Sequence, residues 1–110
     1  MSEAVKKRFD ELEQLALQHA KAQALVDHLT EFRKSKKALL MKEAEKSGKT
    51  TAAIQEREAY AHPEYVQLLE ALCEATEKAV ALKWRLELSR MRFEWARSKE
   101  ATRRAEMNLR

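Results

Sequence analysis

Residues 44–65 decide the fold, and they read AEKSGKTTAAIQEREAYAHPEY. This stretch holds the only glycine of the 110-residue chain, Gly48, and its only proline, Pro63. Glycine can adopt the left-handed conformation that ends a helix. Basic side chains stabilise the negative carboxyl end of a helix, and three lie close to Gly48, namely Lys42, Lys46 and Lys49. We therefore expect a long helix to stop at Ser47-Gly48.

A short helix is expected next, over about 51–61. Thr50 or Thr51 can cap its amino end, and Ile54 and Tyr60 are its expected apolar contacts. His62 ends it, because the residue before a proline is disfavoured in the helical conformation. Pro63 fits the first turn of the helix that follows.

The two flanking segments contain no helix breaker and consist mainly of strong helix formers, with apolar residues at steps of three, four and seven. In the first segment the apolar rows are Val5, Phe9, Leu12 and Ala16, then Leu15, Ala22 and Leu29, with a further row at Leu25, Phe32 and Leu39. We expect an all-α, single helical domain over 1–110. Its long helices, about 2–47 and 63–108, form a coiled-coil-like antiparallel hairpin, joined by a connector with a short helix at 48–62. The scarcity of glycine and proline excludes a many-stranded β fold.

The third helix carries two apolar stripes rather than one. The first holds Tyr65, Leu68, Leu69, Leu72, Ala79, Leu86 and Phe93. The second is expected a quarter to a third of a turn away and holds Val66, Cys73, Val80, Trp84, Leu88, Met91 and Trp95. One antiparallel neighbour covers one stripe. We therefore expect Val80, Trp84, Leu88, Met91 and Trp95 to form an interface, either in a homo-oligomer, most simply a twofold dimer with a four-helix core, or with a larger protein.

Positive charge is concentrated at the carboxyl end. The net charge of the chain is +4, but residues 83–110 carry nine basic and four acidic side chains, so this segment alone has a charge of +5. Arginine suits forked contacts with phosphates, and Trp84 and Trp95 could stack on bases. DNA is thus a possible partner, with candidate contacts Arg85, Arg92, Arg97, Lys99, Arg103 and Arg104. The alternative interpretation is a solvated helix face with tryptophans that pack against protein.

No catalytic, metal or cofactor site is expected. None of His19, His28 and His62 follows a glutamate at the spacing of helical di-iron sites, and a single cysteine cannot build a structural zinc site. Ser47-Gly48-Lys49-Thr50 resembles the tail of a phosphate-binding loop but lacks the preceding glycine and strand. Cys73 is expected to be a small packing residue rather than a nucleophile.

The sequence favours a cytoplasmic location. No run of about 18 apolar residues is present, so we expect no membrane span. Residues 1–10 lack the apolar core of a secretory signal. The lone cysteine fits a reducing compartment.

Residues 50–108 resemble small helical proteins of tailed phages and prophages. The resemblance is carried by Arg57-Glu58-Ala59-Tyr60-Ala61, Pro63-Glu64-Tyr65, Lys83-Trp84-Arg85-Leu86, Glu94-Trp95-Ala96-Arg97-Ser98 and Ala101-Thr102-Arg103-Arg104-Ala105-Glu106. The first helix is similar only as a generic coiled coil. Such proteins are encoded near single-strand annealing and exonuclease genes, so the resemblance implies a role in phage recombination or replication.

Three functions are therefore open. The first is a non-enzymatic accessory protein of phage DNA recombination or replication that self-associates and binds DNA or a DNA-bound protein. The second is a phage inhibitor or modulator that docks on a host nuclease, polymerase or defence complex. The third is a coiled-coil spacer without a specific ligand.

Overall fold

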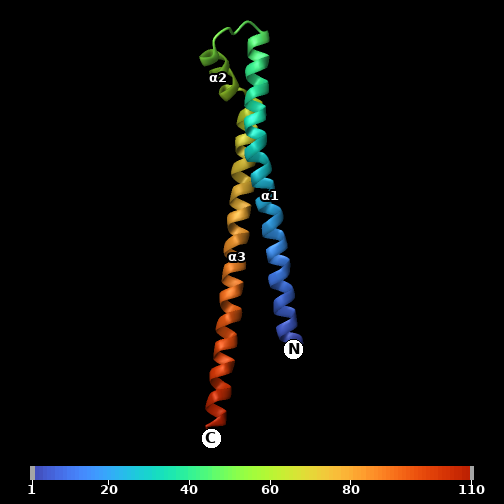
Figure 1. The fold of residues 1–110 in the computed structure, drawn as a ribbon, viewed down its shortest axis with the longest axis vertical. Helices are drawn as coiled ribbons and strands as arrows, with labels where there is room; N and C mark the ends of the chain where they lie inside the picture. The colour runs from blue at the N-terminus through green and yellow to red at the C-terminus, as the bar shows by residue number, and fades with distance from the viewer. Residues whose placement is uncertain (1, 110) are drawn as a thin grey trace. The chain divides into compact units, whose positions relative to one another are not determined.

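The computed structural model describes residues 2–109 and is 93% helical. Three helices follow one another along the chain (Figure 1): α1 (Glu3–Lys46), α2 (Ala52–Ala61) and α3 (Pro63–Asn108). None of residues 2–109 lies in a strand. The expected all-α fold, with two long helices and a short helix between them, is confirmed, and the helix bounds agree with the expected ones to about one residue.

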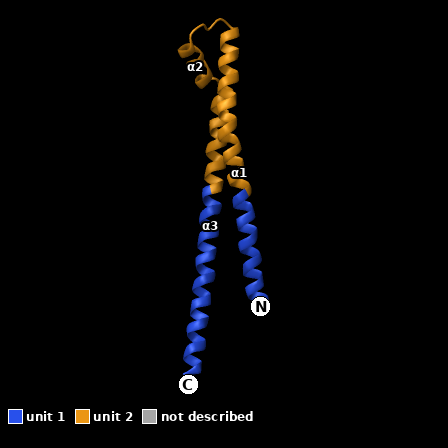
Figure 2. Ribbon diagram, viewed as in Figure 1, with its two compact units in different colours: residues 1–20, 80–110 blue, residues 21–79 orange. Residues whose placement is uncertain are grey.

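The chain contacts group into two compact units (Figure 2). Unit 1 comprises residues 1–20 and 80–110, and unit 2 comprises residues 21–79. Within each unit a segment of α1 lies beside a segment of α3 that runs in the opposite direction. Unit 2 also contains α2 and both connections, so it holds the closed end of the hairpin.

The carboxyl end of α1 is closed by Gly48. Its φ of 98° lies in the left-handed region, the only positive φ among the described residues. The Lys49 amide donates to the Ala44 carbonyl at 3.0 Å, and the Gly48 amide donates to the Glu45 carbonyl at 3.1 Å. These two bonds define a Schellman motif, which satisfies carbonyls that the helix end would otherwise leave without partners.

The short helix α2 packs through Ala59 rather than through Ile54. Thr51 is its N-cap, and the Thr51 hydroxyl accepts the Ile54 amide at 3.2 Å. Ala59 is fully buried against Leu40 and Tyr65. Ile54 and Tyr60 are 40% and 45% exposed, so neither is buried, although Tyr60 makes an expected apolar contact, since its ring centroid lies 5.4 Å from that of Tyr65. The reason is size, because a close approach of α2 to α1 and α3 leaves room for a methyl group at the contact point.

His62 joins α2 to α3 by capping both. Its backbone leaves the helical region at φ −65° and ψ 134°, which ends α2. Its Nδ1 accepts the Glu64 amide at 3.1 Å, which satisfies an amide in the first turn of α3. Lys36 Nζ lies 2.6 Å from Glu64 Oε2 and thereby ties α1 to this first turn.

The face of α3 that packs against α1 repeats at steps of three and four. Its less exposed residues are Tyr65, Leu68, Leu72, Ala75 and Ala79 in unit 2, then Leu82, Leu86, Ser89, Phe93, Ala96 and Glu100 in unit 1. We call this face the seam. Its average spacing of about 3.5 residues is the period of a left-handed coiled coil. Leu69, which was expected on the first stripe, is 38% exposed and lies beside the seam.

The apolar rows of α1 also divide into buried and exposed residues. Val5, Leu12, Leu15, Ala22 and Leu29 are buried or half-buried, whereas the further row of Leu25, Phe32 and Leu39 is 43–60% exposed. Phe9 is 46% exposed, yet its ring lies 4.8 Å from the ring of Phe93 on α3. This aromatic pair therefore joins α1 to α3 near the amino end of α1.

Candidate protein and nucleic-acid interface

The five residues expected to form an interface all lie on α3 within unit 1, and all five are exposed. We call them the outer stripe: Val80 48%, Trp84 59%, Leu88 47%, Met91 60% and Trp95 66% exposed. Both tryptophans are thus more than half exposed. The chain therefore displays two tryptophans and a methionine to solvent on a single helix face, which is unusual for an unpartnered surface.

The outer stripe faces away from α1. At about 100° per residue it is centred about 160° from the seam residues Leu82, Leu86, Ser89, Phe93 and Ala96. The expected separation of a quarter to a third of a turn is therefore too small. The coiled-coil seam shifts by about 20° per seven residues relative to a straight helical projection. Over the Trp84–Trp95 segment this shift places the seam on the side of α3 opposite the outer stripe.

Charged side chains of opposite sign flank the outer stripe. On one side lie Arg85, Arg92 and Lys99, each seven residues from the next, and we call them the basic edge. On the other side lie Glu87 and Glu94, also seven apart, which we call the acidic edge. Steps of seven keep side chains in one row along a helix, so each edge runs parallel to the apolar stripe.

The six candidate DNA contacts do not form one surface. Arg103 continues the basic edge, but Arg97 and Arg104 lie on the side of α3 that faces the amino end of α1. There they line a groove of about 580 Å³ together with Arg8, above Phe9 and Phe93. The Glu100 carboxylate also lines this groove, so the three guanidinium groups leave it with a net positive charge that suits an anionic ligand. Sequence reasoning missed Arg8, because only the pairing register of the two helices brings it to Arg104.

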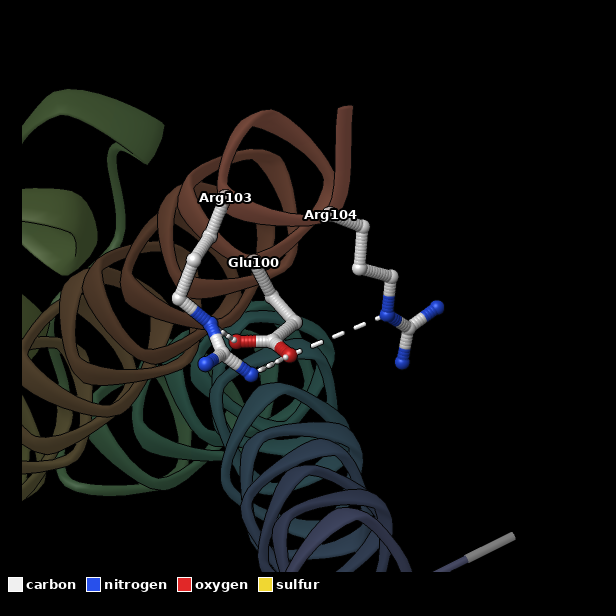
Figure 3. A network of polar contacts seen from close by, with 3 residues as sticks. All are labelled: Glu100, Arg103 and Arg104. Atoms are coloured by element: carbon white, nitrogen blue, oxygen red, sulfur yellow. Dashed lines mark hydrogen bonds and ion pairs between the residues drawn. The ribbon is translucent and has the colours of Figure 1, made fainter. Parts of the chain in front are cut away.

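Glu100 holds the last two candidate arginines (Figure 3). Its carboxylate accepts hydrogen bonds from Arg103 Nε at 3.2 Å and Arg103 Nη2 at 2.7 Å, while Arg104 Nε lies 3.7 Å away. The hydrogen bonds from Arg103 lower the pKa of Glu100, and the charge of Arg104 adds to this effect. Glu100 in turn raises the pKa of Arg103. One carboxylate shared between two guanidinium groups leaves a net positive cluster.

Two basic side chains lie over aromatic rings. Lys99 Nζ is 5.0 Å from the Trp95 ring centroid, and Arg97 Cζ is 5.9 Å from that of Phe93. Both distances are within the range of cation–π attraction. The Trp95 ring therefore has a cation across one face and does not stand alone in solvent.

Other residues singled out in the sequence are separated in the structure. Cys73 is exposed rather than packed within the chain, with its Sγ 3.9 Å from a Glu77 carboxylate oxygen. Within residues 2–109 no three histidine, cysteine or acidic side chains are close enough together to hold a metal ion. No described helix has a stretch that is long and apolar enough to cross a membrane.

Comparison with known proteins adds no relative. No protein-family model matches the chain, and no curated protein or solved structure is significantly similar to it. The arrangement of residues in unit 1 is therefore the physical basis for a function.

Proposed function

We propose that the chain is a non-enzymatic helical accessory protein of phage DNA recombination or replication. It acts by self-association and by binding DNA or a DNA-bound protein. The observation that carries this proposal is the outer stripe, whose two indole rings are exposed on the side of α3 opposite α1. The phage setting rests on the resemblance of residues 50–108, and with it goes a location in the host cytoplasm.

The outer stripe supports self-association because its exposure is costly. Burying a large apolar side chain contributes roughly 1.5–3 kcal/mol, and Trp84, Leu88, Met91 and Trp95 lie within three turns of one helix. Tryptophan, methionine and arginine are the residue types enriched at protein interfaces. A partner that covers this stripe therefore removes from water the apolar surface that a single chain leaves exposed, and this burial stabilises the complex.

The carboxyl end supports DNA binding because its positive charge is clustered. Arg97 and Arg104 line the groove with Arg8, and Arg103 shares Glu100 with Arg104. Clustered guanidinium groups can contact phosphates, and each contact releases counterions from the nucleic acid.

The test is light scattering with and without oligonucleotide. We expect the wild-type chain to form dimers that bind single- or double-stranded DNA, with affinity that falls steeply as salt is raised. Replacement of Arg97, Arg103 and Arg104 by alanine should abolish most of the binding. The matched control replaces three exposed lysines elsewhere, Lys21, Lys42 and Lys78, and should bind DNA nearly as the wild type does. Unchanged binding by the arginine variant would rule out direct contact through this end.

A second candidate function is favoured by the same exposed stripe. A tryptophan-rich stripe rimmed by arginine has the composition of an interface hot spot, so it could dock on a host nuclease, polymerase or defence complex. Capture of one host enzyme in a fixed ratio, by a chain that remains monomeric, would favour this function over self-association.

A further inference from the structure

We propose that the outer stripe is covered by a second copy of this chain whose α3 runs parallel and in register. This inference deepens the proposed function, since it rests on self-association and adds the orientation of the partner. Its consequence is that both carboxyl-terminal arginine clusters come to lie at the same end of the dimer.

The outer face of α3 carries a second heptad pattern of its own. Ala81, Trp84, Leu88, Met91, Trp95 and Ser98 follow one another at steps of three and four, and all six are exposed. This is the spacing of the a and d positions of a coiled coil. The pattern lies entirely in unit 1, and it points away from the α1 segment of that unit.

The charged edges decide the orientation of the second copy. In this heptad Glu87 and Glu94 take g positions, and Arg92 and Lys99 take e positions. In a parallel coiled coil a g side chain meets the e side chain five residues further along its neighbour. Glu87 therefore meets Arg92 of the second copy, and Glu94 meets Lys99 of the second copy. Twofold symmetry doubles these two attractive pairs to four.

An antiparallel arrangement of the same faces brings like charges together. Its g positions meet g positions and its e positions meet e positions, so Glu87 and Glu94 would approach glutamates while Arg85, Arg92 and Lys99 would approach basic residues. Like charges at these distances destabilise a helix pair. The opposite signs of the two edges thus select the parallel arrangement.

The charged groups required are available. Among residues 2–109, no intrachain ion pair involves Arg85, Arg92, Glu94 or Lys99. Glu87 is paired only with Arg90, at 3.2 Å, on the helix surface. Surface pairs of this kind are weak, so Glu87 can turn to a neighbour at little cost.

The position of the outer stripe also changes the expected assembly. Because the stripe is opposite the seam, the α1 and α3 segments of unit 1 in the two copies line up in a row, with the two α3 helices at the centre. A four-helix core around one common axis does not form. Arg92 and Lys99 then belong to the dimer, and DNA contact falls to Arg97, Arg103 and Arg104 from both copies.

Disulfide trapping tests the orientation. In a Cys73→Ser background, Ala81→Cys and Ser98→Cys each place one thiol in the outer heptad, at exposed positions whose replacement spares the seam. In the parallel dimer both variants should oxidise readily to covalent dimers, because a disulfide requires Cα atoms about 4–7 Å apart. In an antiparallel dimer centred near Leu88, the two Ser98 positions would be about 30 Å apart at 1.5 Å per residue. Dimers that resist trapping at both positions would overturn the parallel arrangement and leave self-association intact.

Charge reversal tests the pairing. Glu87→Lys with Glu94→Lys converts four attractive pairs into four repulsive ones, so the dimer dissociation constant should rise roughly ten- to a hundredfold. Adding Arg92→Glu and Lys99→Glu to the same chain reverses both edges and should restore wild-type affinity. The control, Glu43→Lys with Glu45→Lys, makes the same charge change on α1 and should leave the dimer intact.

The antiparallel arrangement predicts a different result for the same variants. In that arrangement the glutamate reversal only exchanges one like-charged pair for another, so the dimer dissociation constant would stay nearly constant. The variant with all four substitutions would then have no lost affinity to restore. Circular dichroism confirms that each variant keeps its helix content. A wild-type chain that stays monomeric at high concentration would overturn both this inference and the self-association on which it rests.

Discussion

Gly48 closes α1 through its backbone conformation alone. At a φ of 98° a residue with a Cβ atom has a strained backbone, although no atom lies within 4 Å of the position that the Cβ atom would occupy. Gly48→Ala should therefore lower the free energy of unfolding by about 1 kcal/mol, the cost of a left-handed conformation for an L-residue. Urea denaturation followed by circular dichroism measures the change. Gly48→Asn should lose less, because asparagine tolerates this conformation better, and an equal loss in both variants would contradict the backbone explanation.

The ion pair between Lys36 and Glu64 should make part of the stability depend on pH. The hydrogen bond and charge of Lys36 lower the pKa of Glu64 below its ordinary value of 4.5. A lowered pKa in the folded state means that the stabilisation is fully present above pH 4.5, and is lost as the pH falls through the folded-state value. Lys36→Gln should move the pKa of Glu64 back toward 4.5. Carbon-13 NMR titration of the Glu64 carboxyl group measures this shift, and Lys34→Gln, which removes a lysine paired with Glu31, should leave it unchanged.

At the scale of elements, the helices could be predicted because their ends have local causes. Gly48 and Pro63 act within a few residues of themselves, so the sequence alone places the ends of α1 and α2 and the start of α3. Contacts between helices have no such local cause. Arg8 meets Arg97 and Arg104 only through the pairing register of α1 and α3, and Ala59 is buried only because three helix segments converge on it.

The angle between the seam and the outer stripe shows where a sequence argument loses accuracy. A projection at 3.6 residues per turn treats α3 as straight, whereas its buried residues repeat at about 3.5. The error grows along the helix. It is small near Tyr65 and larger further along α3, which is why the buried Leu82 was not placed on the expected buried stripe. The exposure of the outer stripe could be predicted, and its position opposite α1 could not.

The packing of α2 against α1 and α3 should depend on the size of the side chain at position 59. Ala59 is fully buried, and Lys37 holds α2 further through Glu56 at 3.4 Å and the Tyr60 ring at 4.6 Å. Tyr60 and Glu56 together raise the pKa of Lys37, so the lysine is charged in this position. Ala59→Leu should destabilise the protein by roughly 1–3 kcal/mol, because a filled contact has no room for more methylenes. Ala53→Leu, at an exposed position of the same helix, should be nearly neutral in the same denaturation experiment.

At the scale of the molecule, each chain has an apolar stripe that it does not cover itself, close to a basic carboxyl end. The question is what covers this stripe. The further row of Leu25, Phe32 and Leu39 on α1 in unit 2 shows that some apolar exposure occurs elsewhere. The outer stripe differs from that row because it combines two tryptophans, a heptad pattern and flanking edges of opposite charge. A surface that is complementary to itself in one orientation favours its own copy as the partner.

Association of this kind should make thermal stability depend on protein concentration. A second copy that binds only the folded chain stabilises it by mass action. Each tenfold rise in total concentration above the dissociation constant adds about 0.7 kcal/mol per chain, because the concentration of free chain grows only as the square root of the total. For about 100 residues, 1 kcal/mol shifts Tm by about 4–8 °C. The Tm of the wild type should therefore rise by several degrees between dilute and concentrated solutions in differential scanning fluorimetry. Trp84→Gln with Trp95→Gln should give a Tm that is independent of concentration yet close to that of the dilute wild type, since both tryptophans are more than half exposed, on the face of α3 opposite the seam. A large fall in Tm at every concentration would instead mean that the two rings stabilise the single chain, and no partner would be needed to explain them.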